Sequence, residues 1–394
     1  MTDRIAYADL DGHPLVRALA DVHRHAGDPA AAAGLARAVF GLRTGVPRAV
    51  ARLVLGSEGP FARLARAGLA PGDRRLAQAA AELEALGELA HADIATALGH
   101  HGLEAAAPAG EGHPEDAPPA VRELTAALAA DAGWGGRAAD IAAFHAAEGT
   151  GALATHRVLR FADHRLTGID HPDPIAPEDL IGGDARRAPL RDALERFAAG
   201  SPANDALVYG PPGTGKSATV RALAAGLAHT GLRLVQVDRA EAGVIGALFA
   251  RLAGDGPRCL VLLDDLVFDD QARTDRELRA ALEGDAAGRP PNVLVWATSN
   301  RLKLLRETHS EREDDLDEAL GRGEKAALAT RFGLRVPFPG LGQDEYLEVA
   351  MGLVERFGGP REGAPAAALR FARQGHGMSP RTARQFAVDW AGRA

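Results

Sequence analysis

The sequence has very little cysteine and no long uncharged apolar run. Its one cysteine, Cys259, lies within an apolar stretch, so no disulfide framework can form within the chain, and we expect the thiol to be a small buried side chain. No run of about 18 uncharged apolar residues occurs, so no membrane-spanning helix is expected. Residues 1–9 lack the basic segment and the apolar core of a secretory signal. These absences predict a soluble, cytoplasmic protein without membrane association.

Lysine is also nearly absent. Of 45 basic residues, only Lys216, Lys303 and Lys325 are lysines, and arginine supplies the others. The formal net charge of −8 argues against broad, non-specific nucleic-acid binding, although it leaves a local basic patch open. A chain of 394 residues with 46% hydrophobic and 25% charged residues can bury substantial cores, and we expect it to form two or three domains.

The most informative stretch is the phosphate-binding pattern G-x-x-x-x-G-K-[ST] at residues 210–217, called the phosphate loop below. An apolar run at residues 206–209 predicts a buried strand before it, and Val220, Leu223 and Leu227 predict a helix after it. This is the strand, loop and helix context that the pattern requires. The residues that we expect to contact the phosphates are Gly210, Pro211, Pro212, Gly213, Thr214, Gly215, Lys216, Ser217 and Ala218.

Each part of this loop has a chemical reason. Glycines can adopt positive φ, which lets the backbone close around phosphate oxygens. The N–H groups of the loop and the N-terminus of the following helix offer donors and positive potential to an anion. Lys216 would reach the β- and γ-phosphates, and Ser217 would bind Mg²⁺. The alternative interpretation is a chance glycine-rich turn in front of a core helix.

Helical periodicity dominates residues 1–165, and the sequence indicates no chemistry for them. The stretch 105–120, rich in Ala, Pro, Gly and acidic residues, predicts a flexible linker. Three histidines, His91, His100 and His101, lie close together, but they lack the spacing and the supporting carboxylate of a metal site. We therefore expect them to be solvated or core residues.

Strands and helices alternate further along the chain, which predicts a parallel sheet covered by helices on both faces. The expected strands are residues 232–237, 259–263 and 293–297, and the expected helices are 185–199, 241–252 and 274–283. Pro189 should be tolerable only near the first turn of its helix. The sequence thus predicts a helical N-terminal domain at 1–165, an α/β nucleotide-binding domain at 166–339 and a helical lid at 340–394.

Polar residues follow two of the predicted strands. Asp264 and Asp265 come directly after 259–263, and the strand at 293–297 ends in Thr298-Ser299-Asn300. Ligands of parallel sheets lie at the carboxyl ends of strands, so these groups should converge on the phosphate loop. Asp264 could then bind Mg²⁺, Asp265 could polarise the attacking water, and Asn300 could bind the γ-phosphate or that water. The alternative is that these residues only cap turns.

This order of motifs resembles the AAA+ ATPases. Further matches are Asp179-Leu-Ile-Gly182 before the first core strand, Thr330-Arg-Phe-Gly333 after a helix, and Met378-Ser-Pro-Arg381 at the start of the last helix. The resemblance covers about residues 170–394. It is closest to a bacterial family of stand-alone AAA+ ATP-binding proteins of unknown function, and it implies a P-loop AAA+ core with a C-terminal helical lid and an N-terminal all-α domain.

The resemblance also implies roles for single residues. Leu180 and Ile181 would contact adenine, Asp264 would be the Walker B metal ligand, and Asn300 would be sensor 1. Arg381 would be sensor 2 in the lid, and Arg331 would be the arginine finger that completes a neighbouring subunit's site. The implied cofactors are ATP and Mg²⁺, and the implied partners are further copies of the chain and a macromolecule that the sequence does not identify. A nucleic-acid partner is conceivable, but no DNA-binding motif supports it.

One departure from the family pattern leaves the activity open. Where AAA+ machines carry Asp-Glu, this chain has Asp264-Asp265, and the shorter side chain could hold the water less well. ATP hydrolysis that acts on a macromolecular partner is the first hypothesis, and a slow nucleotide-dependent switch is the second. A small-molecule kinase would leave Arg331 and Arg381 without a role. The acidic run at residues 307–318 predicts a solvated loop or a partner contact near a subunit boundary.

Overall fold

The structure is a computed structural model, and it describes residues 4–40, 42, 44–70, 72–101, 117–173, 175, 177–238, 245–254, 256–266, 289–300 and 331–392. The Cα positions divide the chain into two compact units. The first is made mainly of residues 1–159, and the second holds most of the chain from residue 173 onwards. The predicted helix at 274–283 and the acidic run at 307–318 lie outside the described residues, as does most of the predicted linker.

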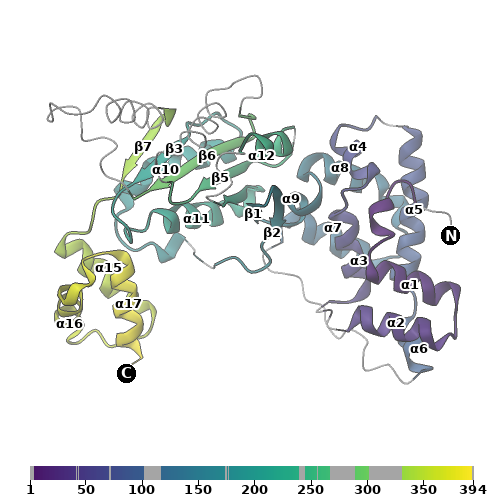
Figure 1. Cartoon of the computed structure of the whole chain (residues 1–394), viewed down its shortest axis with the longest axis horizontal. Coiled ribbons are helices and arrows are strands. Elements are labelled where there is room, and N and C mark those ends of the chain that lie inside the picture. Colours follow the sequence, from purple (N-terminus) through teal and green to yellow (C-terminus); the bar gives the residue numbers. More distant parts are fainter. Residues whose placement is uncertain are drawn as a thin grey trace. The chain divides into compact units, whose positions relative to one another are not determined.

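The first unit is helical, as the periodicity predicts (Figure 1). Its helices are α1 (Pro14–Arg24), α2 (Pro29–Val39), α3 (Val46–Leu55), α4 (Pro60–Arg66), α5 (Arg74–Ala90), α6 (Ile94–Gly99), α7 (Pro119–Ala130), α8 (Ala138–Glu148) and α9 (Gly151–Thr155). Leu83, Leu86 and Leu89 recur along one face of α5 and are buried in a shared core. Trp134 is fully buried there, and its indole N–H donates to the Leu128 carbonyl oxygen at 2.7 Å.

Two polar side chains that pack within this unit, Glu82 and His91, have partners on the backbone. The carboxylate of Glu82 on α5 accepts the backbone N–H groups of Ile5, Ala6 and Tyr7 at 2.9–3.1 Å. It thereby fixes the start of the described chain to α5. Nε2 of His91 lies 3.0 Å from the Leu128 carbonyl oxygen, which is a contact typical of a histidine packed in a protein interior. Among the described residues, no group of three potential metal ligands is found.

His145 on α8 makes the stability of this unit depend on pH. Its side chain is fully buried, Nδ1 lies 3.1 Å from the Gly149 carbonyl oxygen, and burial lowers its pKa to about 4 from 6.5. Between these values the unfolded chain binds a proton that the folded chain does not, so stability rises with pH. We expect the free energy of unfolding to fall by about 3 kcal/mol as the pH drops from 7.5 to 4, at about 1.4 kcal/mol per pKa unit.

The measurement is urea unfolding at several pH values, followed by tryptophan fluorescence. His145→Asn removes the titrating group and keeps a donor near the Gly149 carbonyl, so the pH dependence should become flatter by about that amount, whatever the variant's stability at pH 7.5. Equal pH dependence in the two proteins would contradict the assignment.

A β-hairpin occupies the end of the region that the sequence predicts as helical. β1 (Val158–Ala162) and β2 (Arg165–Gly168) are joined by Asp163 and His164, which both have positive φ, 50° and 57°. Two positive φ values are typical of the type I′ turn that favours Asn-Gly, and the Asp-His pair hides this signal. The prediction of helix up to residue 165 is wrong here. The alternation of buried and more exposed side chains that is typical of a strand was nevertheless present in the sequence, because the apolar residues Leu159 and Phe161 are buried and their neighbours are not.

The chain forms a seven-stranded sheet in the order β2-β1-β4-β5-β6-β3-β7, and the strands β3 to β7 belong to the second unit. The strands after the hairpin are β3 (Ala206–Tyr209), β4 (Arg233–Val237), β5 (Cys259–Leu263), β6 (Val293–Ser299) and β7 (Leu334–Pro337). The pairs β3–β6, β3–β7, β4–β5 and β5–β6 are parallel, as predicted. Every residue of β5 and β6 is buried, including Cys259, and continuous burial is typical of a central parallel strand.

Two predictions about this unit need correction. β6 continues through Thr298 and Ser299, so only Asn300 follows the strand. The hydroxyls of Thr298 and Ser299 suggested a turn, yet their backbones still pair with β3. In addition, Pro189 lies inside α10 (Asp184–Ala198), beyond its first turn. The helix continues past the missing N–H because its apolar face, with Leu190, Leu194 and Phe197, is buried.

Helices complete the second unit around this sheet (Figure 1). α10 precedes β3, α11 (Lys216–Gly226) follows it, and α12 (Ile245–Leu252) lies between β4 and β5 in the chain. The C-terminal helices α15 (Gln343–Arg356), α16 (Ala364–Phe371) and α17 (Pro380–Ala391) form a small bundle, called the lid below. Tyr346 is buried in it, and Phe386 stacks on Trp390 with ring centroids 5.6 Å apart, as expected for core packing.

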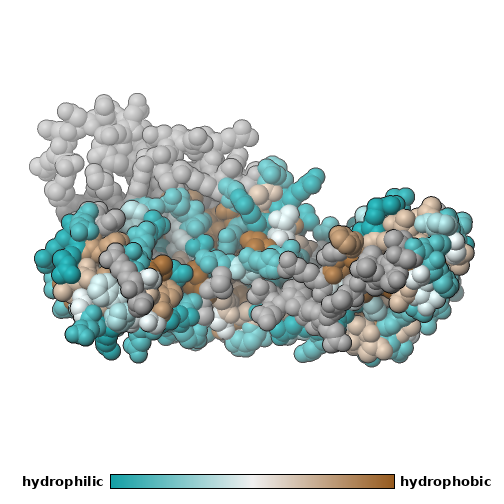
Figure 2. Space-filling model, turned by 90° about the horizontal axis from the view of Figure 1, so that it is seen from below, coloured by the Kyte–Doolittle hydropathy of each residue, from teal (hydrophilic) through white to brown (hydrophobic). Residues whose placement is uncertain are grey.

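The described surface carries few large apolar side chains. Figure 2 shows one face, on which hydrophilic residues dominate and apolar ones are interspersed. Ile5, Phe40, Phe357 and Val388 are the exposed large hydrophobic residues of the described part of the chain. Within the same part, no helix is long and apolar enough to cross a bilayer.

Candidate functional site

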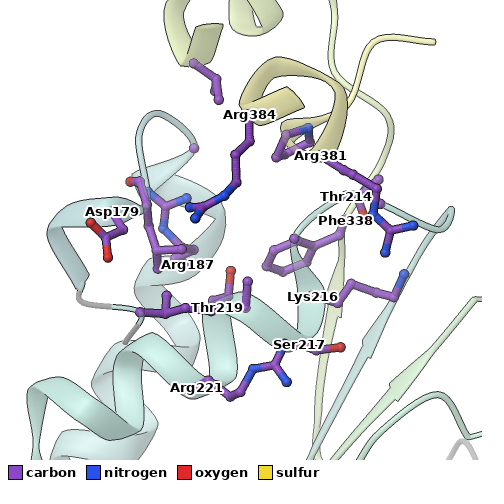
Figure 3. A pocket seen from close by; sticks show the side chains of 18 of the residues that line it. Asp179, Arg187, Thr214, Lys216, Ser217, Thr219, Arg221, Phe338, Arg381 and Arg384 are labelled. Carbon is purple, nitrogen blue, oxygen red and sulfur yellow. The ribbon is translucent and has the colours of Figure 1, made fainter. Parts of the chain in front are cut away.

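A cavity of about 650 Å³ opens where the phosphate loop, the ends of β5 and β6, and the lid meet. Figure 3 shows its two ends. Lys216, Ser217 and Arg381 lie at the first, called the phosphate end below, and Asp179, Arg187 and Arg384 lie at the second, called the base end. Residues from distant parts of the second unit thus surround one space, as the strand-end argument predicts.

The phosphate loop has the backbone that its glycines were expected to permit. Gly210, Gly213 and Gly215 have φ values of 152°, 80° and 89°, all in the range that side chains disfavour. The Gly210 N–H donates to the Ser299 carbonyl oxygen at 3.1 Å. A Cβ atom on Gly210 would overlap the backbone carbonyl of Phe338, so close approach as well as conformation requires glycine there.

Lys216, the first residue of α11, directs its ammonium group back over the loop. The side chain is buried, and Nζ donates to the carbonyl oxygens of Gly210 (2.9 Å) and Pro211 (2.8 Å) and to Asn300 Oδ1 (2.7 Å). The pKa of Lys216 is lowered, because the effect of burial exceeds the opposing effect of the Asp265 and Asp264 carboxylates. The ammonium group lies between the loop and Asn300 at the phosphate end.

A carboxylate and a hydroxyl meet beside this lysine. Ser217 Oγ donates to Asp264 Oδ1, and Thr298 Oγ1 donates to the same oxygen at 2.7 Å. Hard oxygen donors of this kind suit Mg²⁺, which usually takes only one or two protein ligands and keeps several waters. Because the two oxygens touch, one cation could contact Ser217 and Asp264 at once, directly or through water, so the residues fit a magnesium site.

Asp265 turns away from its strand with a positive φ of 55°. Its carboxylate accepts a hydrogen bond from the amide nitrogen of Asn300, and the amide oxygen of Asn300 accepts one from Lys216. The backbone N–H of Asp265 donates to Thr298 Oγ1 at 2.8 Å. The structure therefore connects Lys216, Asn300 and Asp265 in one chain of hydrogen bonds.

The base end is formed by the segment before α10. Leu180 and Ile181 line it, and Gly182 and Gly183 follow with φ values of 65° and 70°. Arg187, which is only 7% exposed, donates to the Leu180 carbonyl oxygen at 2.7 Å. This buried guanidinium group therefore holds the backbone of the segment before α10 in place at Leu180.

The lid contributes two arginines from one face of α17. Arg381 and Arg384 both line the cavity, and the Arg381 N–H lies 3.4 Å from the Gly213 carbonyl oxygen. α17 begins at this point because Ser379 caps it, accepting the Thr382 N–H at 3.1 Å, and Pro380 occupies its first turn. The lid helix is thereby tied to the phosphate loop.

The structure brings most of the predicted site residues together. Those that line the cavity are Leu180, Ile181, Pro212, Gly213, Thr214, Gly215, Lys216, Ser217, Ala218, Asp264, Asp265, Asn300 and Arg381. Gly210 and Pro211 take part through their carbonyl oxygens, which accept from Lys216. Arg331 is exposed, lies just before β7, and is not among the lining residues.

Several lining residues were not among the predicted site residues, and the polar residues Thr298, Arg187 and Arg384 belong to this group. The sequence placed Thr298 in the polar triplet that ends a strand, Arg187 in the helix expected at 185–199, and Arg384 in the lid, each without a role. Arg384 could have been found, because it follows Arg381 by three positions and a helix places both on one face. The spacing of Arg187 from Asp184 could have indicated their ion pair, which is 2.9 Å long, but the contact of Arg187 with the Leu180 carbonyl oxygen depends on the fold.

Comparisons with known proteins agree with this fold. A family model described as "Protein of unknown function (DUF815)" matches residues 152–394. The 26S proteasome regulatory subunit 6B homolog of Dictyostelium discoideum is 28% identical over 194 residues, which is 43% of this chain and 45% of that protein. The chain thus spans less than half of the length of this curated relative.

Several solved structures have a partly similar chain trace. The Thermotoga maritima RuvB Holliday junction branch migration motor is 18% identical and has a TM-score of 0.39, and the match covers 55% of this chain and 63% of that one. The FIGL-1 AAA domain in complex with ADP is 18% identical and has a TM-score of 0.38, and the match covers 56% and 73%. The predicted α/β fold, with a mostly parallel sheet and a C-terminal helical lid, is confirmed.

Proposed function

The chain belongs to the family described as proteins of unknown function (DUF815), and from this premise we propose that it is an ATPase of the AAA+ type. In this proposal it binds ATP with Mg²⁺ in the cavity and hydrolyses it to ADP and phosphate. The resulting conformational change would act on a macromolecular partner. Bound Mg²⁺ would supply charge neutralisation for the β- and γ-phosphates.

One observation carries the proposal. Lys216, the Ser217–Asp264 pair and Arg381 lie at the same end of one cavity, although they come from α11, the end of β5 and the lid. Two cations and a cation-binding oxygen pair at one point are the groups that a polyphosphate with its metal requires. A structural role would not need a lysine, an arginine and a carboxylate around an open space.

The base end supports adenine as the base. Ile181 lines it, and within the described residues no hydrogen bond is found for its backbone N–H or C=O group. Adenine carries an acceptor and a donor side by side on its pairing edge, so one backbone N–H and one C=O can satisfy both. Guanine reverses this order of donor and acceptor. We therefore expect ATP to bind more tightly than GTP.

The test is calorimetric titration with ATP and GTP, combined with phosphate release measured against protein concentration. The expected result is Mg²⁺-dependent ATP binding and a turnover per chain that rises with concentration. Absence of ATP binding at millimolar concentrations would disprove the proposal. Tight binding with negligible phosphate release would replace it by the slow switch, which Asp265 in place of a glutamate supports.

We propose further that the ATPase works as a homo-oligomer completed by Arg331. The residue is exposed and lies outside the cavity of its own chain, a placement that suits action on a neighbouring copy. Arg331→Ala should lower turnover by about 10³-fold, the usual value of an arginine finger, and leave ATP binding intact. Arg335→Ala, which removes an exposed arginine of the following strand, is the matched control.

Mixing two inactive variants makes this test sharper. A copy with Arg331→Ala keeps its own phosphate loop, and a copy with Lys216→Ala keeps its arginine. Their mixture should therefore recover part of the turnover that neither shows alone. Wild-type turnover in Arg331→Ala would contradict the role of this arginine without affecting the proposed ATP site.

A further inference from the structure

Thr298, at the end of β6, binds three consecutive residues of the neighbouring segment. Its Oγ1 atom lies 2.7 Å from Asp264 Oδ1 and 2.8 Å from the backbone nitrogen of Asp265. Its carbonyl oxygen accepts the N–H of Leu266 at 2.7 Å. The threonine is 1% exposed and lines the cavity, so these contacts lie away from bulk water.

The chemistry of the contacts fixes the direction of the hydroxyl. A backbone N–H can only donate, so Oγ1 must accept from Asp265. The single hydroxyl proton is then free to go to Asp264, whose ionised carboxylate can only accept. The side chain therefore acts as donor to the first acidic residue and as acceptor from the second.

This arrangement selects one oxygen of Asp264. Both Ser217 and Thr298 donate to Oδ1, which uses the two lone pairs of that atom. In the described part of the chain no hydrogen bond is found for Oδ2. The carboxylate is thereby held in one rotamer, with Oδ2 left for a cation or for a water bound to it.

The same contacts support the unusual backbone of Asp265. A left-handed φ of 55° is disfavoured for residues with a side chain, and aspartate is among the few that tolerate it. The backbone N–H of Asp265 donates to Thr298 Oγ1, and the N–H of the next residue, Leu266, donates to the Thr298 carbonyl oxygen. This double contact holds the carboxylate of Asp265 where the Asn300 amide reaches it.

We propose that Thr298 is a positioning residue for the reaction, which orients the metal-binding carboxylate of Asp264 and the backbone of Asp265 through one hydroxyl group. The inference rests on the proposed function, because it concerns the same ATP site. It assigns no contact with the nucleotide to Thr298 itself. The hydroxyl acts through the two aspartates, so its loss should change metal use and turnover and not the affinity for the nucleotide alone.

The test compares Thr298→Val with Thr298→Ser in the full-length chain. Valine keeps the shape of threonine and removes the hydroxyl, whereas serine keeps the hydroxyl and removes a methyl group. The readouts are kcat and KM for ATP at saturating Mg²⁺, the Mg²⁺ concentration for half-maximal turnover, and the affinity for ATP in EDTA. Thermal unfolding reports any general loss of stability.

We expect Thr298→Val to lower kcat by about 10- to 100-fold and to raise the Mg²⁺ requirement by a similar factor, the usual cost of losing a group that orients a metal ligand. KM and the affinity in EDTA should change less than about threefold. Thr298→Ser should restore most of the turnover. If Thr298→Val does not fold, Thr298→Cys takes its place, because a thiol is a weak donor of similar size. Its kcat should then be lower, and its Mg²⁺ requirement higher, than those of Thr298→Ser.

Two results would overturn the proposal. The first is a kcat and Mg²⁺ requirement in Thr298→Val equal to those of the wild type. The second is an equal loss in the valine and serine variants, which would indicate packing alone. If the wild type binds ATP without turnover, the gain in ATP affinity on adding Mg²⁺ replaces kcat, and the same comparison applies. Failure of the proposed function is distinct, since the wild type itself would then bind no ATP.

Discussion

Gly210→Ala is expected to destroy the phosphate loop and to destabilise the second unit by more than about 3 kcal/mol. The φ of 152° at this position is accessible to glycine and costly for alanine, and the added Cβ atom would overlap the Phe338 carbonyl. That carbonyl is backbone and cannot rotate away as a side chain could. Relief therefore requires β7 or the loop to move. Thermal unfolding measures the loss of stability, and ATP titration measures the loss of binding.

The matched control is the same substitution on α12. Gly246 is an exposed helical glycine with open space around its Cα atom. Alanine there lowers the backbone entropy of the unfolded chain, so Gly246→Ala should stabilise the protein by about 0.5–1 kcal/mol. Opposite signs for two glycine-to-alanine changes would show that the effect at Gly210 comes from its local geometry. A Gly210→Ala protein that is as stable as the wild type would contradict the described loop.

Lys216→Ala is expected to weaken binding of Mg²⁺–ATP by at least about 100-fold. The ammonium would contact two phosphates, and each charge-assisted hydrogen bond is worth about 1.5–3 kcal/mol. Lys216 is the only lysine in the part of the chain that the structure describes. Isothermal titration measures the change in affinity, and phosphate release should fall to background.

Lys216→Arg separates charge from shape. Arginine keeps the positive charge, but its planar guanidinium cannot donate to three converging oxygens as an ammonium does. We expect it to recover part of the affinity and little of the turnover. Unchanged ATP affinity in Lys216→Ala, with the fold intact, would show that the nucleotide does not bind at the phosphate loop.

The sequence was sufficient to predict the parts of the fold that have strong local signals. The phosphate loop, the continuous apolar run of β5 and the helical spacing of the first unit each follow from short-range chemistry, and the structure confirms them. The convergence of Asp264, Asn300 and Lys216 could also be predicted, since parallel strands end at a common edge. The lid contacts the phosphate loop through Arg381 and Gly213. Only the resemblance to AAA+ proteins had suggested that Arg381 belongs to the site.

Other features depend on contacts between distant residues. The turn at Asp163 and His164 lacks the usual glycine, so the hairpin was hidden within a helical region. Thr298 had no predicted role beyond the polar end of its strand, and its three contacts become visible only when β5 and β6 lie side by side. The left-handed backbone of Asp265 also depends on contacts with a distant segment, and nothing in an Asp-Asp pair indicates it.

The contacts of Lys216 have a consequence for how affinity is set. All three protons of its ammonium group are already donated to oxygens of the protein, two on the loop and one on Asn300. Binding of a polyphosphate is then an exchange of partners, and the observed affinity is the difference between the new contacts and the old ones. Changes that only weaken the old contacts should therefore raise the observed affinity. The loop carbonyl groups and the Asn300 amide would thus help to set the affinity of this site for a polyphosphate.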